Sequence, residues 1–283
     1  MFFIYKRHLI YYNPNMKRRI IQLLSFFGIN PFVQNYLSGT IYKGNLKSIC
    51  LPVLNCWSCP GACGSCPIGA IQNYAMYTKY IFSLYTLGII ALFVSILGRF
   101  TCGYICPFGF FQDILKSITK KRVRLNRRFK YTKYIILLIF VFILPYFLKE
   151  PWFSKICPAG FFEAALPLIA ADPTYLSNIS NFFYIKVVLS SIFVVAAVFI
   201  SRPFCQYVCP VGALMELMRP FSLSGLKVDK TCLTCSKCLE VCPMDVDIYN
   251  NPHDCIQCGK CINVCPNNSI KIIYPFKKDK ADV

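Results

Sequence analysis

Two cysteine runs of identical spacing lie near the C-terminal end of this sequence. Each reads CxxCxxCxxxCP, with cysteines at Cys232, Cys235, Cys238 and Cys242, then at Cys255, Cys258, Cys261 and Cys265. Three thiolates two residues apart wrap one corner of a cubane, and the fourth reaches the other cluster. The predicted [4Fe–4S] sites are therefore Cys232, Cys235, Cys238 and Cys265, and Cys255, Cys258, Cys261 and Cys242. A zinc site is the alternative, but zinc needs neither the third close thiol nor the proline.

A second cysteine pattern occurs four times upstream, at Cys66, Cys106, Cys157 and Cys209. Each copy reads CPxGxΦ, where Φ is an apolar residue. A proline directly after the cysteine suits the first position of a helix, whose amide groups then point back toward the sulfur. Such amides stabilise an anionic cluster, and the glycine lets the backbone approach closely. We therefore expect four helices that begin at cysteines.

Two copies of this pattern carry an additional cysteine four residues earlier, Cys102 before Cys106 and Cys205 before Cys209. Both copies follow apolar segments, and Arg99 and Arg202 occupy matching places before them. Two thiolates from each half predict one [4Fe–4S] cluster on a pseudo-twofold axis at the inner face. The alternative is two redox-inactive pairs that pack as small apolar side chains.

The other face receives six cysteines: Cys50, Cys56, Cys59, Cys63, Cys66 and Cys157. The set Cys56, Cys59, Cys66 and Cys157 predicts an outer-face [4Fe–4S] cluster that ties the two halves together. Cys50 and Cys63 are left as extra ligands, as a disulfide, or as free thiols. The four sets together predict four [4Fe–4S] clusters, or about sixteen iron atoms per chain.

The elements that must position these cysteines are largely apolar. The sequence is 56% hydrophobic and 15% charged with a mean hydropathy of +0.49, against about 45–50% and about 25% in soluble domains. Residues 80–97, 134–148 and 182–200 are candidate membrane spans, and residues 20–37 form a weaker one with polar interruptions. We expect an α-helical membrane protein with about four transmembrane helices.

Basic residues alternate along the chain in a way that predicts orientation. Lys and Arg number five in residues 1–19, two in 40–78, ten in 99–133, two in 149–181 and ten in 201–283. With four spans, the rich segments and the C-terminus lie in the cytoplasm. This distribution disfavours nucleic acid as a partner. For the basic loop 116–133 we expect anchoring to anionic lipid, in preference to docking of an acidic ferredoxin or flavodoxin.

The order of spans and motifs predicts three regions. Residues 1–225 form the transmembrane domain, built from a duplicated two-span unit with repeats at about 18–120 and 131–220. Residues 226–275 form a compact α+β ferredoxin domain of the bacterial two-cluster type, and residues 276–283 form a polar tail.

The motifs resemble those of the membrane-bound polyferredoxins similar to the NapH subunit of periplasmic nitrate reductase systems and to the C-terminal half of NosR-type proteins. These proteins share two CxxxCP motifs at span ends and a C-terminal two-cluster ferredoxin domain. The resemblance runs from Arg18 to about Ile272, and residues 50–66 are similar to one branch of the family, whose pattern does not include Cys63. It implies electron transfer between a quinol pool or cytoplasmic donor and an enzyme outside.

The predicted function is therefore the passage of single electrons through [4Fe–4S] clusters in the cell membrane, as an electron-transfer subunit without a substrate site of its own. The expected partners are the lipid bilayer and a redox protein, either a ferredoxin-like or flavodoxin-like donor or a reductase acceptor, with quinone left open. The alternatives are an assembly or maturation factor that reduces a metal or disulfide, and an iron–sulfur redox sensor. The sequence has no GxxxxGK or GxGxxG nucleotide cradle.

Overall fold

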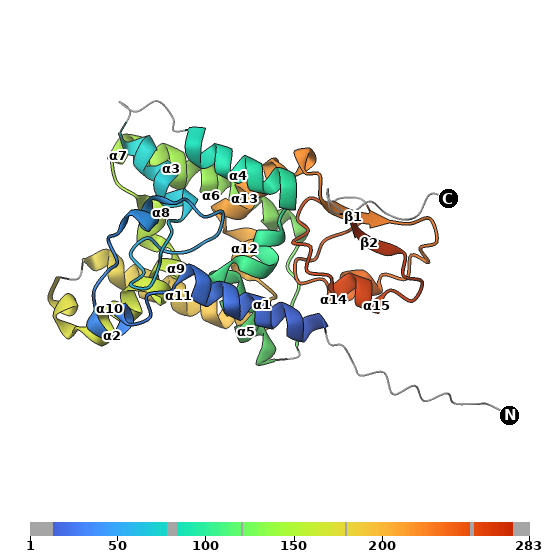
Figure 1. The fold of residues 1–283 in the computed structure, drawn as a ribbon, viewed down its shortest axis with the longest axis horizontal. Coiled ribbons are helices and arrows are strands. Elements are labelled where there is room, and N and C mark those ends of the chain that lie inside the picture. Colours follow the sequence, from blue (N-terminus) through green and yellow to red (C-terminus); the bar gives the residue numbers. More distant parts are fainter. Residues whose placement is uncertain (1–13, 78–83, 120, 179, 250–251, 274–283) are drawn as a thin grey trace.

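The computed structural model describes residues 14–77, 84–119, 121–178, 180–249 and 252–273. A large helical part is followed by a small C-terminal unit that packs against one of its ends (Figure 1). The fold is mostly helical, as the composition predicts.

The two halves of the helical part repeat one order of elements. The first contains α1 (Pro14–Ile29), α2 (Asn35–Ser38), η1 (Asn45–Ser48), α3 (Pro67–Met76), α4 (Leu84–Leu97), the π-helical η2 (Thr101–Ile105) and α5 (Pro107–Ser117). The second contains η3 (Arg127–Tyr131), α6 (Thr132–Ile136), η4 (Leu137–Ile143), α7 (Leu144–Leu148), α8 (Trp152–Ile156), α9 (Pro158–Gly160), η5 (Phe161–Ala165), α10 (Leu166–Ala171), η6 (Pro173–Asn178), α11 (Asn181–Phe199), α12 (Pro203–Tyr207), α13 (Pro210–Leu217) and η7 (Arg219–Phe221). Each half thus has a first helix, a cysteine-capped helix, a long helix and a second cysteine-capped helix.

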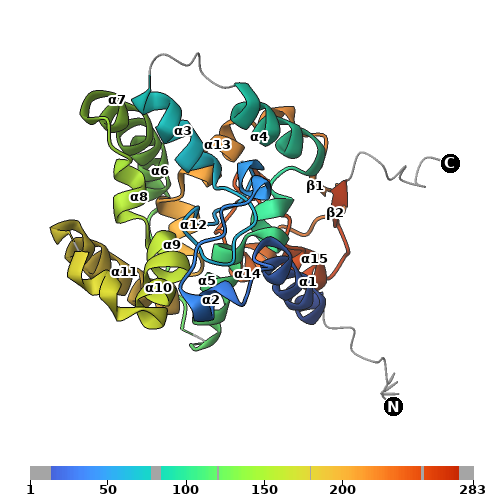
Figure 2. The same ribbon diagram turned by 60° about the vertical axis from the view of Figure 1, so that its left-hand side comes forward.

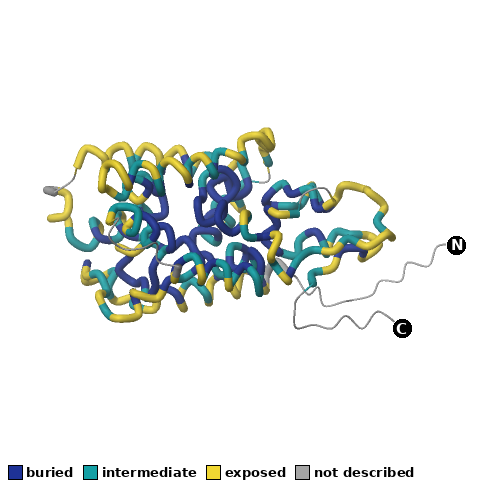
Figure 3. Tube along the Cα trace, turned by 90° about the horizontal axis from the view of Figure 1, so that it is seen from above, coloured by how far each residue is buried: buried dark blue, intermediate teal, exposed yellow. Residues whose placement is uncertain are grey.

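The halves exchange contacts. Helix α5 of the first half packs against α11 of the second, and α13 of the second packs against α4 of the first. Helices α12 and α13 lie between α4 and α11 (Figure 2). The buried residues gather in the middle of the helical part, while exposed residues follow its outer edges (Figure 3).

The first helix differs from the expected span over residues 20–37. Helix α1 ends at Ile29 and the chain then turns, because Asn30 precedes Pro31 and its side chain bonds the Phe26 carbonyl at 3.1 Å. At 1.5 Å per residue the 16 residues of α1 reach about 24 Å, less than the hydrocarbon core of about 30 Å.

Two helical segments in the described part of the chain are long and apolar enough to cross a membrane. They are Arg127–Leu148, which includes the expected span 134–148, and Asn181–Phe199, which matches 182–200. Only 22% and 17% of their most apolar stretches are buried inside the protein. Both segments therefore turn most of their surface outward. The remaining expected span is helical over Leu84–Leu97, and its residues 80–83 lie outside the described residues.

The C-terminal unit contains a two-stranded antiparallel sheet and two short helices. Strand β1 (Gly225–Val228) pairs with β2 (Ile270–Ile273), with Gly225 opposite Ile273. Helices α14 (Lys237–Val241) and α15 (Lys260–Val264) pack against each other. The sheet therefore joins the two ends of the segment that carries both CxxCxxCxxxCP motifs.

Candidate iron–sulfur centres

The two predicted ferredoxin sites are each brought together within the C-terminal unit. One small pocket is lined by Cys232, Cys235, Cys238 and Cys265. The other set lies in and against the core of the unit: Cys255, Cys261, Cys242 and Cys258. In both sets the fourth cysteine comes from the other motif, as the spacing predicts.

The backbone of both motifs turns amide groups toward sulfur. Thr234 and Gln257 adopt positive φ, and their amides donate to Cys232 Sγ at 3.4 Å and Cys255 Sγ at 3.3 Å. Left-handed residues in such loops create concave groups of amides that bind anions. The donor set and these amides together fit a thiolate-ligated anionic cluster.

The inner set comes from matching places in the two halves. Cys102 lies in η2 and Cys205 in α12, whereas Cys106 and Cys209 precede the first residues of α5 and α13. The Gly212 amide donates to Cys209 Sγ at 3.3 Å, which is the contact expected of a cysteine at a helix N-terminus.

Each half also contacts the other half's first cysteine. Gln112 Nε2 donates to Cys205 Sγ at 3.1 Å, and Met215 Sδ lies 3.3 Å from Cys102 Sγ. Gln112 and Met215 occupy the same place in the repeat, six residues after Cys106 and Cys209. These two contacts interlock the halves at Cys102 and Cys205, and they differ because an amide donates to Cys205 whereas a thioether lies against Cys102.

Arg99 and Arg202 are buried beside this site, with 1% and 0% of their surfaces exposed. Arg202 holds Asp113 through Nε at 2.9 Å and Nη2 at 2.7 Å. Arg99 reaches Glu216, the residue equivalent to Asp113, at 3.8 Å, and Asp254 of the C-terminal unit at 2.6 Å. The matching arginines thus bridge from one half to the other, and one also binds the ferredoxin segment.

These arginines lie close to two of the glycines in the cysteine motifs. A Cβ at Gly109 would lie 3.3 Å from the Arg202 guanidinium, and one at Gly212 would lie 3.2 Å from that of Arg99. Glycine therefore lets each cation lie against the opposite cysteine-capped helix.

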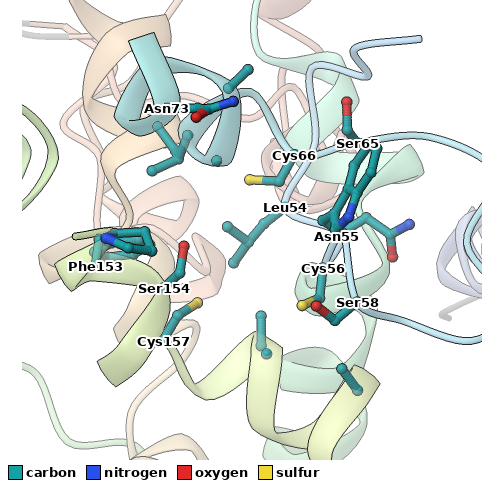
Figure 4. Close-up of a pocket in the computed structure, with 18 of the residues that line it drawn as sticks. Leu54, Asn55, Cys56, Ser58, Ser65, Cys66, Asn73, Phe153, Ser154 and Cys157 are labelled. Atoms are coloured by element: carbon teal, nitrogen blue, oxygen red, sulfur yellow. The ribbon is translucent and has the colours of Figure 1, made fainter. Parts of the chain in front are cut away.

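Three cysteines of the predicted outer set surround a cavity of about 760 Å³. Cys56, Cys66 and Cys157 line it, and their sulfurs point into one common space beside Leu54 (Figure 4). Cys59, the fourth predicted ligand, does not line it. Cys50 and Cys63 do not line it either, and no disulfide joins them.

Glu163 contacts this outer site through the backbone of Cys56. Its Oε2 accepts the Cys56 amide at 2.7 Å, and burial raises the pKa of the carboxyl to about 8 while that hydrogen bond lowers it.

No three His, Cys, Asp or Glu side chains in the described part of the chain are arranged to hold a single metal ion. Cysteines around a four-iron cubane each bind a different iron.

The cysteine sets share neighbouring parts of the core. Cys205 lies in the same core as Cys238, Cys255 and Cys261, and Cys102 packs against both that core and the core of the helical part. At the other end, Cys106 Sγ lies 3.9 Å from the Leu54 carbonyl, and Leu54 also lines the outer cavity. Leu54 therefore contacts the inner set at Cys106 and also lines the outer cavity.

Several charges of the basic loop bind the C-terminal unit of the same chain, and the anchoring of the loop to anionic lipid stays a prediction. Arg122 holds Asp245 at 2.7 Å, and Lys130 donates to the Met244 carbonyl at 2.7 Å. Sequence reasoning missed this contact; the signal available was the set of acids, Asp245, Asp247 and Asp254, between and beside the ferredoxin cysteines.

Two family profiles match parts of the chain. A family profile described as a 4Fe-4S binding domain, Fer4_5, matches residues 78–126, 134–166 and 183–228. A second profile with the same description, Fer4, matches residues 248–271. The chain therefore contains two kinds of 4Fe-4S binding domain, and these domains support iron–sulfur clusters of the [4Fe–4S] type.

Three relatives align with about two thirds of the chain. The uncharacterized proteins MJ0750 and MJ0749 of Methanocaldococcus jannaschii are 26% and 25% identical over 193 residues, which are 65% and 64% of this chain. The putative electron transport protein YccM of Escherichia coli is 23% identical over 211 residues, 65% of this chain. The alignments span 74%, 66% and 54% of these relatives. No solved structure matches the chain significantly.

Proposed function

We propose that this protein carries single electrons across the cell membrane through four [4Fe–4S] clusters held in a row. The clusters, when bound, supply one-electron redox chemistry. The proposed order is the ferredoxin sets, the inner set and the outer set, and similarity to the putative electron transport protein YccM supports a role in electron transport.

The observation that carries the proposal is the contact at Leu54. The inner and outer cysteine sets belong to opposite membrane faces in the predicted topology, and the hydrocarbon core alone is about 30 Å thick. Helices that begin at cysteines inside the protein bring both sets toward its middle, where Cys106 and the outer cavity share Leu54. The chain can therefore connect two faces without one long step.

The outward-facing apolar helices support a bilayer as the surroundings. Side chains on α11 such as Tyr184, Val188 and Ile192 are 66%, 57% and 61% exposed, and apolar surface of this extent on a spanning-length helix is suited to lipid. We place the ferredoxin domain in the cytoplasm, where a ferredoxin-like or flavodoxin-like donor reaches it. A reductase outside, with quinone as the other candidate, then exchanges electrons with the outer set.

Vesicles test the proposal. Anaerobically purified protein is inserted into liposomes loaded with ferricyanide, and dithionite is added outside. We expect faster bleaching of ferricyanide than in protein-free vesicles. Cys106→Ala should reduce the rate to that of the leak, whereas Cys63→Ala, which changes a thiol outside the row, should leave it unchanged. Wild-type vesicles that bleach no faster than empty ones would contradict the proposal.

A further inference from the structure

Three cysteines line the outer cavity, which is one fewer than the four irons of a cubane. Cys56, Cys66 and Cys157 come from two segments: the loop before α3, which carries Cys56 and ends at Cys66, and the residue that precedes α9. Their sulfurs converge in Figure 4. No other cysteine lines the cavity among the residues that the structure describes.

Cys59 is engaged elsewhere. Its side chain is completely buried, and its Sγ lies 2.9 Å from Tyr36 Oη and 3.4 Å from Asn30 Oδ1. Tyr36 lies in α2, and Asn30 directly follows the end of α1. The side chain of Cys59 is thus held by these two residues and does not line the cavity.

The cavity has room and charge for a further ligand. Its volume of about 760 Å³ lies in the range of about 300–1,000 Å³ that is usual for pockets of drug-sized ligands. A cubane of eight core atoms is smaller than such ligands. Lys186 and Lys47 line the cavity, and a Cβ at Gly160 would lie 3.1 Å from Lys186 Nζ and 3.5 Å from Cys56 Sγ. Lys186 therefore stands next to a predicted cluster ligand, across a glycine.

We propose that the outer cluster is held by Cys56, Cys66 and Cys157 alone and that its fourth iron faces the cavity, where it binds a small anionic ligand such as a thiolate beside Lys186. Metal sites that keep a position free of protein ligands are the ones that bind exogenous groups. This inference rests on the outer cluster of the proposed function. It gives the chain a ligand-binding iron at the outer end of the row.

Variants of single cysteines test the ligand set. Cys66→Ser and Cys157→Ser should each remove the outer EPR signal and about four irons of about sixteen. Cys59→Ser should keep that signal and the iron. Loss of the outer signal in Cys59→Ser, with the ferredoxin signals intact, would overturn the inference. If Cys66→Ser and Cys157→Ser leave iron and spectra unchanged, there is no outer cluster, and the proposed function fails at its outer end instead.

Two measurements on the wild-type protein decide the matter even where Cys59→Ser does not fold. One-electron oxidation by ferricyanide should convert the outer [4Fe–4S]²⁺ cluster to [3Fe–4S]⁺, with release of one Fe²⁺ per chain and the electron passing to ferricyanide. Titration with 2-mercaptoethanol should shift the outer EPR signal and leave the ferredoxin signals in place. Lys186→Gln should raise the half-saturating thiolate concentration roughly tenfold, the effect of one lost charge-assisted hydrogen bond. An outer signal that neither loses iron nor responds to thiolate would overturn the inference.

Discussion

Buried charge beside the inner cysteines is arranged as pairs between the two halves. Asp113 forms ion pairs with Arg202 at 2.7 Å and with Arg18 of α1 at 2.5 Å. Burial alone would raise the pKa of Asp113, but the two guanidiniums and Gln22 hold it below its ordinary value. The stabilisation is therefore fully present above the ordinary carboxyl pKa of about 4 and is lost only as the pH falls through the lowered value.

Replacing this carboxylate should cost far more than replacing a surface one. Asp113→Asn leaves two buried guanidiniums without a counter-charge, which costs about 3 kcal/mol of unfolding free energy. Glu150→Gln is the matched control, because Glu150 is 50% exposed and pairs only with Lys155 at the surface, which is worth less than about 1 kcal/mol. Thermal unfolding in detergent measures both. Equal losses in the two variants would show that the buried pair has no special role.

We expect Gln112 to raise the reduction potential of the inner cluster. A hydrogen bond to a thiolate ligand stabilises the additional negative charge of the reduced state. Gln112→Leu removes the bond to Cys205 Sγ and should lower the inner reduction potential by on the order of tens of millivolts. Gln72→Leu is the control, because Gln72 occupies the same repeat position but bonds the Phe140 carbonyl and Ser154. EPR-monitored titration compares them, and an unchanged potential in Gln112→Leu would refute the role.

At the scale of elements, the sequence predicted the beginnings of the cysteine-capped helices better than the course of the long ones. Proline after Cys66, Cys106, Cys157 and Cys209 marks the first helical residue in all four copies, because proline is suited to that position. The end of α1 was misplaced, since apolar Phe32 and Val33 extend the hydropathy beyond Asn30 and Pro31, where local geometry ends the helix.

The loop before α6 should keep the ferredoxin domain in place. Arg122 bonds Asp245 and the carbonyls of Glu240 and Cys242, so Arg122→Ala removes contacts both with α14 and with the segment that follows it. We expect faster hydrogen–deuterium exchange in residues 237–246 of this variant. Arg127→Ala is the control, because Arg127 is 57% exposed and makes one 3.5 Å pair with Asp247. Equal exchange in both variants would show that the loop does not dock the domain.

At the scale of the whole molecule, the local cysteine motifs were readable, but the contacts between halves were not. Spacing along the chain grouped the ferredoxin ligands, since each run carries three of them. Nothing in the spacing indicates that Cys59 turns toward Tyr36, that Leu54 lies between two sets, or that Asp254 inserts beside Arg99. These depend on how separate segments pack, which hydropathy and motif patterns do not encode.

The shared inner cluster is the central claim, and spectroscopy of single variants tests it most directly. If Cys102, Cys106, Cys205 and Cys209 ligate one cluster, changing any one of them to Ala should abolish the same EPR signal, because a cubane left with three of its thiolates becomes labile or altered in potential. The two ferredoxin signals, which depend on separate cysteines, should persist and serve as the internal control. If Cys102→Ala and Cys205→Ala instead remove different features, and the double variant loses their sum, the halves hold separate sites and the account is wrong.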